Sequence, residues 1–226
     1  FTGTSKFIPS EERLFAGGPN TLRGFKQNDL GPKVYIARDF DTVRVDGAPV
    51  TAGSVTPADT VFFRTKTNVS PDRSVPTGGS ALVVGNLEGR IPSPIFSEYL
   101  QLAAFVDAGE LWSPGAKQRE DRYTSIKVTP GVGVRYLSPI GAIRVDIAYN
   151  PYAPRAGAAF FDTPVSEGGQ LFCVSPGNTL AVTNLGATDG SRPVQATGSC
   201  ITDFRPPART SFISRLRLSI GIGQAY

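Results

Sequence analysis

The sequence predicts an all-β fold, the C-terminal portion of a transmembrane antiparallel up-and-down β-barrel, and three observations support this prediction. Five segments alternate apolar residues with polar residues or glycine, which is the pattern of strands with one apolar face. The connections between these segments alternate strictly between short and long. The chain ends on an aromatic residue, in LRLSIGIGQAY. Outer-membrane barrels combine such strands with short turns at one end and longer loops at the other.

The five strands are expected at about residues 79–91, 98–112, 124–137, 141–152 and 211–226. Their lengths suit strands that cross a membrane at a tilt. Soluble antiparallel sheets alternate in the same way, so a buried strand of a soluble sandwich is the alternative. The connections favour the barrel, because PSPIFSE and SPIG are short, whereas SPGAKQREDR and residues 153–209 are long. The fifth apolar face is expected to run from Phe212 to Tyr226.

Composition excludes several classes of function. The 226 residues include no histidine and two cysteines, which removes Ser-His-Asp and Cys-His catalytic sites, imidazole metal ligands and a structural zinc site. The net charge of +4 is not gathered into a basic stripe, so no nucleic-acid partner is expected. No run of 18 apolar residues encodes a transmembrane helix. We therefore expect neither enzymatic activity nor a bound cofactor or metal.

Five strands are too few to close a barrel, since the smallest outer-membrane barrels have eight. An open sheet edge in lipid would leave backbone groups without hydrogen-bond partners. We expect the remaining strands to lie upstream in a longer polypeptide, and closure by oligomerisation is the alternative. The chain starts at Phe1 without a methionine or a signal peptide, which agrees with a fragment or a processed piece.

Four blocks of sequence resemble one family. IPSEERLFAGGPNTLRGFKQNDLGP, residues 8–32, resembles the sixth extracellular loop of the BamA and TamA assembly factors, in which a Gly-Gly pair precedes a [VL]-R-G-[FY] motif. FVDAG, residues 105–109, resembles the F-x-D-x-G strand motif of this family. GVGVRYLSPIGAIRVDIAYNP, residues 131–151, is similar to the next hairpin, and SIGIGQAY to the closing strand. The blocks occur in the order of the family.

The resemblance implies how the chain is divided. Residues 1–78 would be the lumen-inserting loop with the RGF motif, and residues 79–226 the last five strands of a sixteen-stranded barrel. The connection at about residues 153–209 would be a long extracellular loop. The family also implies a bacterial outer-membrane location, a periplasmic C-terminus, extracellular long loops, and POTRA repeats upstream of the barrel.

The resemblance implies that the sixth loop folds back into the barrel, where Arg23 meets acidic residues of the inner wall. The alternation agrees, since apolar faces toward lipid put Glu88, Asp107 and Asp146 on the lumen side. Asp107 is the expected partner, through two parallel hydrogen bonds, with Glu88 and Asp146 in supporting roles. A solvent-exposed Arg23 is the alternative. An acid–base pair of Asp107 and Asp146 is a further alternative, without a recognisable nucleophile or substrate pocket.

The neighbours of this ion pair have expected packing roles. Leu22 and Phe25 are expected to pack against wall side chains such as Phe105. Gly24 permits a close backbone approach or a positive φ, and Gly109 completes the strand motif.

The closing strand contains Gly221, Gly223 and Tyr226. Glycine weakens a strand interior and permits bending, so we expect a weak seam between the first and last strands, where a client strand adds to the sheet edge. The alternative is that these glycines make room for lumen side chains. Cys173 and Cys200 lie in the last long connection, outside the cell by topology, where a disulfide is expected. Two free thiols are the alternative.

The family implies insertion and folding of other β-barrel proteins, without covalent chemistry or a nucleotide. The implied partners are outer-membrane lipids, client β-barrel or autotransporter polypeptides, and periplasmic or lipoprotein accessory subunits. A two-partner secretion pore and the barrel anchor of a patatin-like lipase are the alternatives. A plain porin is disfavoured, because it has no reason to hold an RGF loop against F-x-D-x-G.

Overall fold

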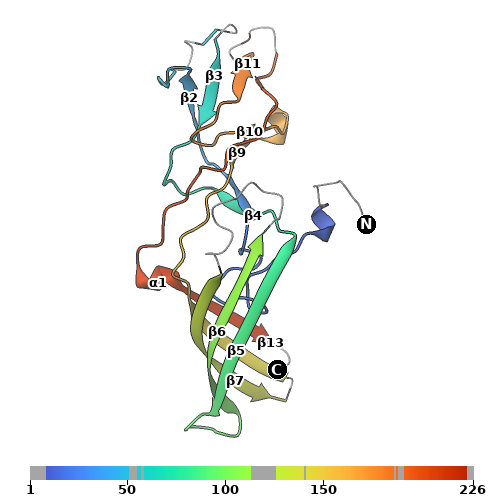
Figure 1. The fold of residues 1–226 in the computed structure, drawn as a ribbon, viewed down its shortest axis with the longest axis vertical. Helices are drawn as coiled ribbons and strands as arrows, with labels where there is room; N and C mark the ends of the chain where they lie inside the picture. The colour runs from blue at the N-terminus through green and yellow to red at the C-terminus, as the bar shows by residue number, and fades with distance from the viewer. Residues whose placement is uncertain are drawn as a thin grey trace. The chain divides into compact units, whose positions relative to one another are not determined.

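A computed structural model describes residues 9–50, 55–56, 59–112, 126–139, 141–185, 187 and 191–222. The chain forms two compact units (Figure 1). The first, here called the sheet unit, comprises Phe1–Pro32, Pro76–Ala153 and Arg209–Tyr226. The second, here called the insert unit, comprises Lys33–Val75 and Pro154–Ala208. Within the described residues, no helix is both long enough and apolar enough to cross a membrane.

The sheet unit contains one five-stranded antiparallel sheet. Its strands are β5 (Ala81–Pro92), β6 (Leu100–Trp112), β7 (Lys127–Ser138), β8 (Gly141–Tyr149) and β13 (Leu216–Ile222). They pair in the order β13-β8-β7-β6-β5. Each strand therefore pairs with the strand of this sheet that precedes or follows it along the chain, and the strands of the insert unit that come between β8 and β13 in the sequence are not part of this sheet. This arrangement is an open up-and-down meander, as in part of an outer-membrane barrel.

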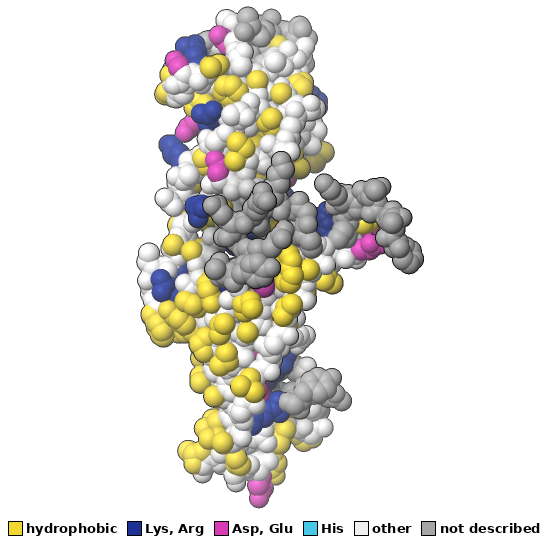
Figure 2. Space-filling view, viewed as in Figure 1, with side chains coloured by type: hydrophobic (Ala, Val, Ile, Leu, Met, Phe, Trp, Pro, Cys, Tyr) yellow, Lys and Arg dark blue, Asp and Glu magenta, His cyan; other side chains and the backbone are white. Residues whose placement is uncertain are grey.

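The two faces of this sheet differ in exposure and in chemistry. The face with aliphatic side chains is open: Leu87 is 76% exposed, Leu218 65% and Ile220 61%. Figure 2 shows hydrophobic side chains on the surface of the sheet unit. The opposite face carries charged and polar side chains that are buried, including Asp107, Thr129, Arg135 and Asp146. A soluble sheet buries its apolar face instead, so the predicted fold class, part of a membrane barrel, is confirmed.

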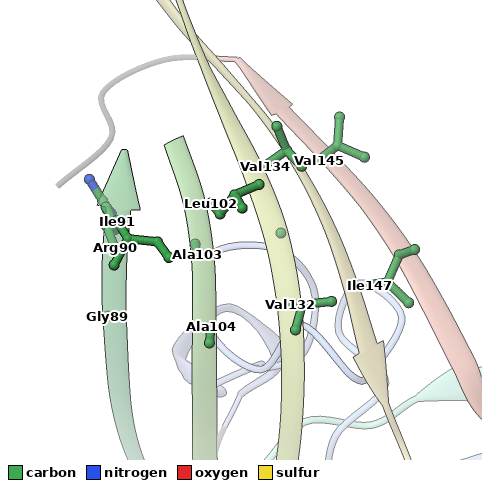
Figure 3. A pocket seen from close by; sticks show the side chains of 11 residues that line it. Gly89, Arg90, Ile91, Leu102, Ala103, Ala104, Val132, Val134, Val145 and Ile147 are labelled. Atoms are coloured by element: carbon green, nitrogen blue, oxygen red, sulfur yellow. The ribbon is translucent and has the colours of Figure 1, made fainter. Parts of the chain in front are cut away.

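The apolar face is hollowed across strands β5 to β8 (Figure 3). The hollow has a volume of about 660 Å³. Its floor includes the small residues Gly89 and Ala104, which are directly paired, while Leu102, Val134 and Val145 form the next row across the sheet. Arg90 is the charged residue among those that line it, so the hollow suits hydrocarbon groups.

The first four strands lie close to their predicted positions, whereas the fifth begins later. Residues Phe212–Arg215 form one helical turn, α1, and β13 starts at Leu216. The prediction of a strand face that begins at Phe212 is therefore wrong. Asn150 N donates to Arg215 O at 2.9 Å, and the next residue, Pro151, has no N–H to continue the ladder. Gly223 and Tyr226 lie outside the described residues.

The insert unit contains two four-stranded sheets. One has the order β10-β9-β1-β4 and the other β12-β11-β3-β2. The strands are β1 (Lys33–Ile36), β2 (Asp41–Arg44), β3 (Val61–Arg64), β4 (Arg73–Pro76), β9 (Ala159–Asp162), β10 (Leu171–Cys173), β11 (Ala181–Thr183) and β12 (Val194–Gln195). Short 3-10 turns occur at Ser10–Glu12 and Val165–Glu167. The unit joins two connections that the sequence analysis treated as separate loops, one within residues 1–78 and one at about residues 153–209.

A shared core explains why these connections fold together. Tyr35 and Val61 of the first connection pack in one buried cluster with Ala159, Phe172 and Phe204 of the second. The parallel pairing of Tyr35 with Ala159 joins the two connections at the backbone. The insert unit thus has its own hydrophobic core.

A disulfide crosslinks the insert unit. Cys173, at the end of β10, is bonded to Cys200, with a sequence separation of 27. The bond closes a long segment of the unfolded chain, which restricts its conformational entropy.

We expect the double variant Cys173→Ser and Cys200→Ser to destabilise the insert unit by about 3 to 4 kcal/mol, because the closed segment gains freedom when unfolded. The measurement is the urea concentration at which the amides of β10 and β11 lose half of their protection from hydrogen exchange, here called the midpoint. Exchange in β7 of the sheet unit is the internal control and should be unchanged. Equal midpoints for β10 with and without the disulfide would contradict this expectation.

Candidate functional site

The segment from Ala16 to Gly31, here called the RGF loop, is a closed loop on the polar face of the sheet. Ala16 pairs with Leu30 at its base, and Leu14 pairs with Gly79 just before β5. Gly18 N lies 3.1 Å from both Leu22 O and Phe25 O, so the turn is tied to its own backbone. Gly18 has a φ of 97°, a conformation that favours glycine.

Arg23 lies at the tip of this loop and contacts Asp107 of β6 through three hydrogen bonds. Arg23 N donates to Asp107 Oδ2 at 2.9 Å, Nε donates to the same oxygen at 2.8 Å, and Nη2 donates to Oδ1 at 2.6 Å. Arg23 is 5% exposed and Asp107 is 0% exposed. The guanidinium therefore binds the carboxylate in the bidentate geometry of strong charge-assisted pairs, and the loop backbone binds the same group.

Two further carboxylates surround Arg23. Its Nη1 lies 2.5 Å from Glu88 Oε2 and 3.9 Å from Asp146 Oδ2. Arg135 bridges the same two acids, since its Nη1 donates to Asp146 Oδ1 at 2.6 Å and its Nη2 donates to Glu88 Oε2 at 2.9 Å. The structure thus brings together Arg23 and all three acids that the sequence analysis named.

The charges of this cluster balance. Arg90 Nε donates to Glu88 Oε1 at 2.7 Å, so three arginines face three carboxylates. Asp107 and Asp146 have fully buried side chains and Glu88 is 16% exposed at its side chain. Buried charges without partners are strongly destabilising. Removal of Arg23 would leave three carboxylates with two cations.

Phe105 contacts the arginine of the RGF loop. Its ring lies under the Arg23 guanidinium, with 3.4 Å between Cζ and the ring centroid, so it contributes a cation–π contact. Leu22 is fully buried in a cluster with Ala16, Leu30 and Leu111, and Phe25 packs against that cluster. The apolar residues beside Arg23 therefore bind the loop to itself and to the end of β6.

Glycines make the close approach of loop and sheet possible. A Cβ at Gly24 would collide with the side chain of Thr129 on β7, and a Cβ at Gly109 would lie 2.7 Å from Leu22 Cδ1. At Gly221 of β13, a Cβ would lie 2.5 Å from Arg144 Nε. The position of Gly221 therefore favours the interpretation that glycine makes room for polar-face side chains.

Several contacts of the loop involve residues that the sequence analysis did not assign to the site. Asn86 Nδ2 donates to Thr21 O at 2.6 Å and to Asp107 Oδ1 at 2.8 Å. Asn150 Nδ2 donates to Gly24 O at 2.9 Å. Both asparagines stand on the polar faces of the predicted strands, which is a signal for their position but not for their partners. Among the described residues, no group of acids and cysteines could hold a metal ion.

The fold and the site define a segment of an outer-membrane β-barrel whose polar face binds a loop through a buried arginine. A sequence model of the Omp85 superfamily domain matches residues 1–159. The chain belongs to the Omp85 superfamily, whose members are outer-membrane proteins that insert or secrete other proteins. The resemblance to BamA and TamA is confirmed at the level of this superfamily.

Gly24→Ala tests the close packing of loop and sheet. Overpacking of a buried contact costs roughly 1 to 3 kcal/mol, so we expect the Arg23 amide, which donates to Asp107, to exchange about 5- to 150-fold faster. Thr129→Gly in the same chain should restore much of the protection, because it removes the colliding side chain. Gly85→Ala, where an added Cβ meets no atom within 4 Å, is the matched control. Equal exchange rates in Gly24→Ala and Gly85→Ala would contradict the packing argument.

Proposed function

We propose that this protein is an outer-membrane β-barrel assembly factor, which inserts and folds client outer-membrane proteins while an Arg–carboxylate contact holds its RGF loop in the barrel lumen. The observation that carries the proposal is the burial of Arg23 against Asp107, with Glu88 and Asp146 around it. A loop that merely crossed the surface would have no need of a charge-matched site on β5, β6 and β8.

The two faces of the sheet support the proposed orientation. The exposed aliphatic face suits contact with lipid, and the face with the ion pairs suits a water-containing lumen. The turns from β5 to β6 and from β7 to β8 are short, whereas both chain segments of the insert unit connect to the sheet at its other end. By the rule of short periplasmic turns, the insert unit is extracellular and the C-terminus is periplasmic.

The proposed mechanism uses backbone hydrogen bonding rather than covalent chemistry. Within the described residues, β13 pairs with β8, and in the full barrel its other edge would meet the first strand at the proposed weak seam. When this seam opens, that edge offers unpaired N–H and C=O groups. A client strand adds to such an edge by β-augmentation, and the surrounding lipid provides the solvent for its apolar face. The partners of this mechanism are outer-membrane lipids, client β-barrel or autotransporter polypeptides, and periplasmic or lipoprotein accessory subunits.

Arg23→Ala in the full-length protein is expected to free the loop and to reduce client assembly. The substitution leaves Asp107 buried without its cation, a loss of roughly 3 to 5 kcal/mol. Arg73→Ala is the matched control, because Arg73 and Asp162 form an exposed pair at 3.2 Å, and exposed pairs contribute at most about 1 kcal/mol. Folded client barrel in the outer membrane is measured by its heat-modifiable migration on gels. Normal client levels and normal protection of the loop from protease in Arg23→Ala would refute the role of Arg23.

Depletion of the full-length protein distinguishes assembly from secretion. An assembly factor is required for several unrelated barrel proteins to reach the membrane, whereas a two-partner secretion pore is required for one exported polypeptide. We expect several barrels to accumulate unfolded in the periplasm after depletion. Loss of one secreted polypeptide with normal barrels would overturn the proposed function in favour of secretion.

A further inference from the structure

Two residues that follow β8, Asn150 and Tyr152, bind the RGF loop at Gly24 and Phe25 rather than at Arg23. We propose that they form a second anchor, free of net charge, which couples the seated loop to the start of the closing strand β13. This inference rests on the proposed function, because it concerns the same loop and the same strand. It assigns positioning roles to two residues outside the Arg–carboxylate cluster.

The Asn150 side chain bonds both to the loop and to its own turn. Its Nδ2 donates to Gly24 O at 2.9 Å, and its Oδ1 accepts from Tyr152 N at 3.0 Å. Asn150 is 2% exposed, so loss of either contact leaves a buried polar group unsatisfied, which costs more than an average hydrogen bond contributes. Asn150 therefore holds the residue that directly follows Arg23.

The Asn150 backbone reaches the closing strand. Asn150 N donates to Arg215 O at 2.9 Å, beside the first pair of the ladder, Leu216 with Tyr149. One residue thus binds the loop through its side chain and the start of β13 through its backbone. Displacement of Gly24 shifts Asn150, and a shift of Asn150 weakens the hydrogen bond at which β13 begins.

Tyr152 anchors the next loop residue. Its ring lies parallel to that of Phe25, with centroids 6.5 Å apart and an interplanar angle of 18°. Its hydroxyl accepts from Val128 N of β7 at 2.9 Å, and Lys127 Nζ lies 4.7 Å from the ring centroid. The side chains at 150 and 152 therefore hold Gly24 and Phe25, while the carboxylates hold Arg23.

Asn86 provides a matched comparison. It also donates a side-chain hydrogen bond to a loop carbonyl, Thr21 O, and it supports Asp107 through a second one. However, it stands on β5, at the opposite edge of the sheet from β13. A role restricted to loop packing predicts similar consequences for both asparagines. A coupling role predicts that Asn150 alone transmits the state of the loop to β13.

Amide hydrogen exchange of the full-length protein in lipid vesicles tests the coupling. Arg23→Ala should accelerate exchange in Leu216–Ile222 about tenfold, which is the size of effect expected when a buried hydrogen bond is lost. Asn150→Ala should give the same acceleration, and the double variant should exceed neither single variant. Asn86→Ala should leave β13 exchange within about twofold of the unsubstituted protein, because Gly24 stays bonded to Asn150. Unchanged β13 exchange in Arg23→Ala, or effects that multiply in the double variant, would overturn the coupling.

Two conservative variants keep the proposal testable if Asn150→Ala does not fold. Asn150→Asp retains the acceptor for Tyr152 N but places an anion against Gly24 O, so it should accelerate β13 exchange as Asn150→Ala does. Tyr152→Phe keeps the ring and removes the hydroxyl, so the Val128 amide alone should lose protection. No change at Val128 would overturn the assignment of Tyr152.

The readout separates this inference from the function on which it rests. Exchange in β13 requires no client protein. Coupling between Arg23 and β13 without client assembly would overturn the proposed function alone. If client proteins are assembled but the β13 exchange rate is the same with and without Arg23→Ala, the coupling alone would be overturned.

Discussion

Burial of one guanidinium sets the requirements for the rest of the sheet unit. Arg23 stays protonated at any ordinary pH, so its place on the polar face must supply negative charge and hydrogen-bond acceptors in the correct geometry. Asp107 does this for both the side chain and the backbone of the loop, and Glu88 and Asp146 complete the surroundings. A buried ion pair gains little over an apolar contact of the same shape, yet it is costly to break by removal of one partner. It therefore specifies where the loop sits more strongly than it stabilises the fold.

The same requirement explains the glycines of the polar face. Large charged side chains lie flat on the sheet when the positions beside them are small. A Cβ at Gly131 would collide with the Phe105 ring, and a Cβ at Gly133 would collide with Asp146. Glycine weakens a strand interior, and here the long ladders that join β5, β6, β7 and β8 compensate for this loss of stability. The low strand propensity at Gly131 and Gly133 is thus a consequence of packing large and charged side chains on this face of the sheet.

The alternation of apolar and polar residues was sufficient to predict the long strands and to assign their faces, because each of these strands spans several repeats of the pattern. The RGF and F-x-D-x-G motifs were sufficient to predict that Arg23 and Asp107 meet. The insert unit could not be predicted, because its strands are two to four residues long and Tyr35 pairs with Ala159, far away in the sequence. The contact of Asn150 with Gly24 depends on the path of the loop backbone, which residue types do not encode locally.

The two kinds of anchor differ in what can displace them. The Arg23 site selects for charge, because a group that replaces the guanidinium must carry a cation into a place of low exposure. The Asn150 and Tyr152 contacts are a neutral hydrogen bond and a ring stack, which cost less to break than a buried ion pair. In the proposed mechanism a client that adds to the other edge of β13 therefore affects the neutral anchor first, since Asn150 is hydrogen-bonded at the start of that strand. The charged anchor keeps the loop seated meanwhile, so the sheet retains its register at β5 and β6 while its other edge changes partners.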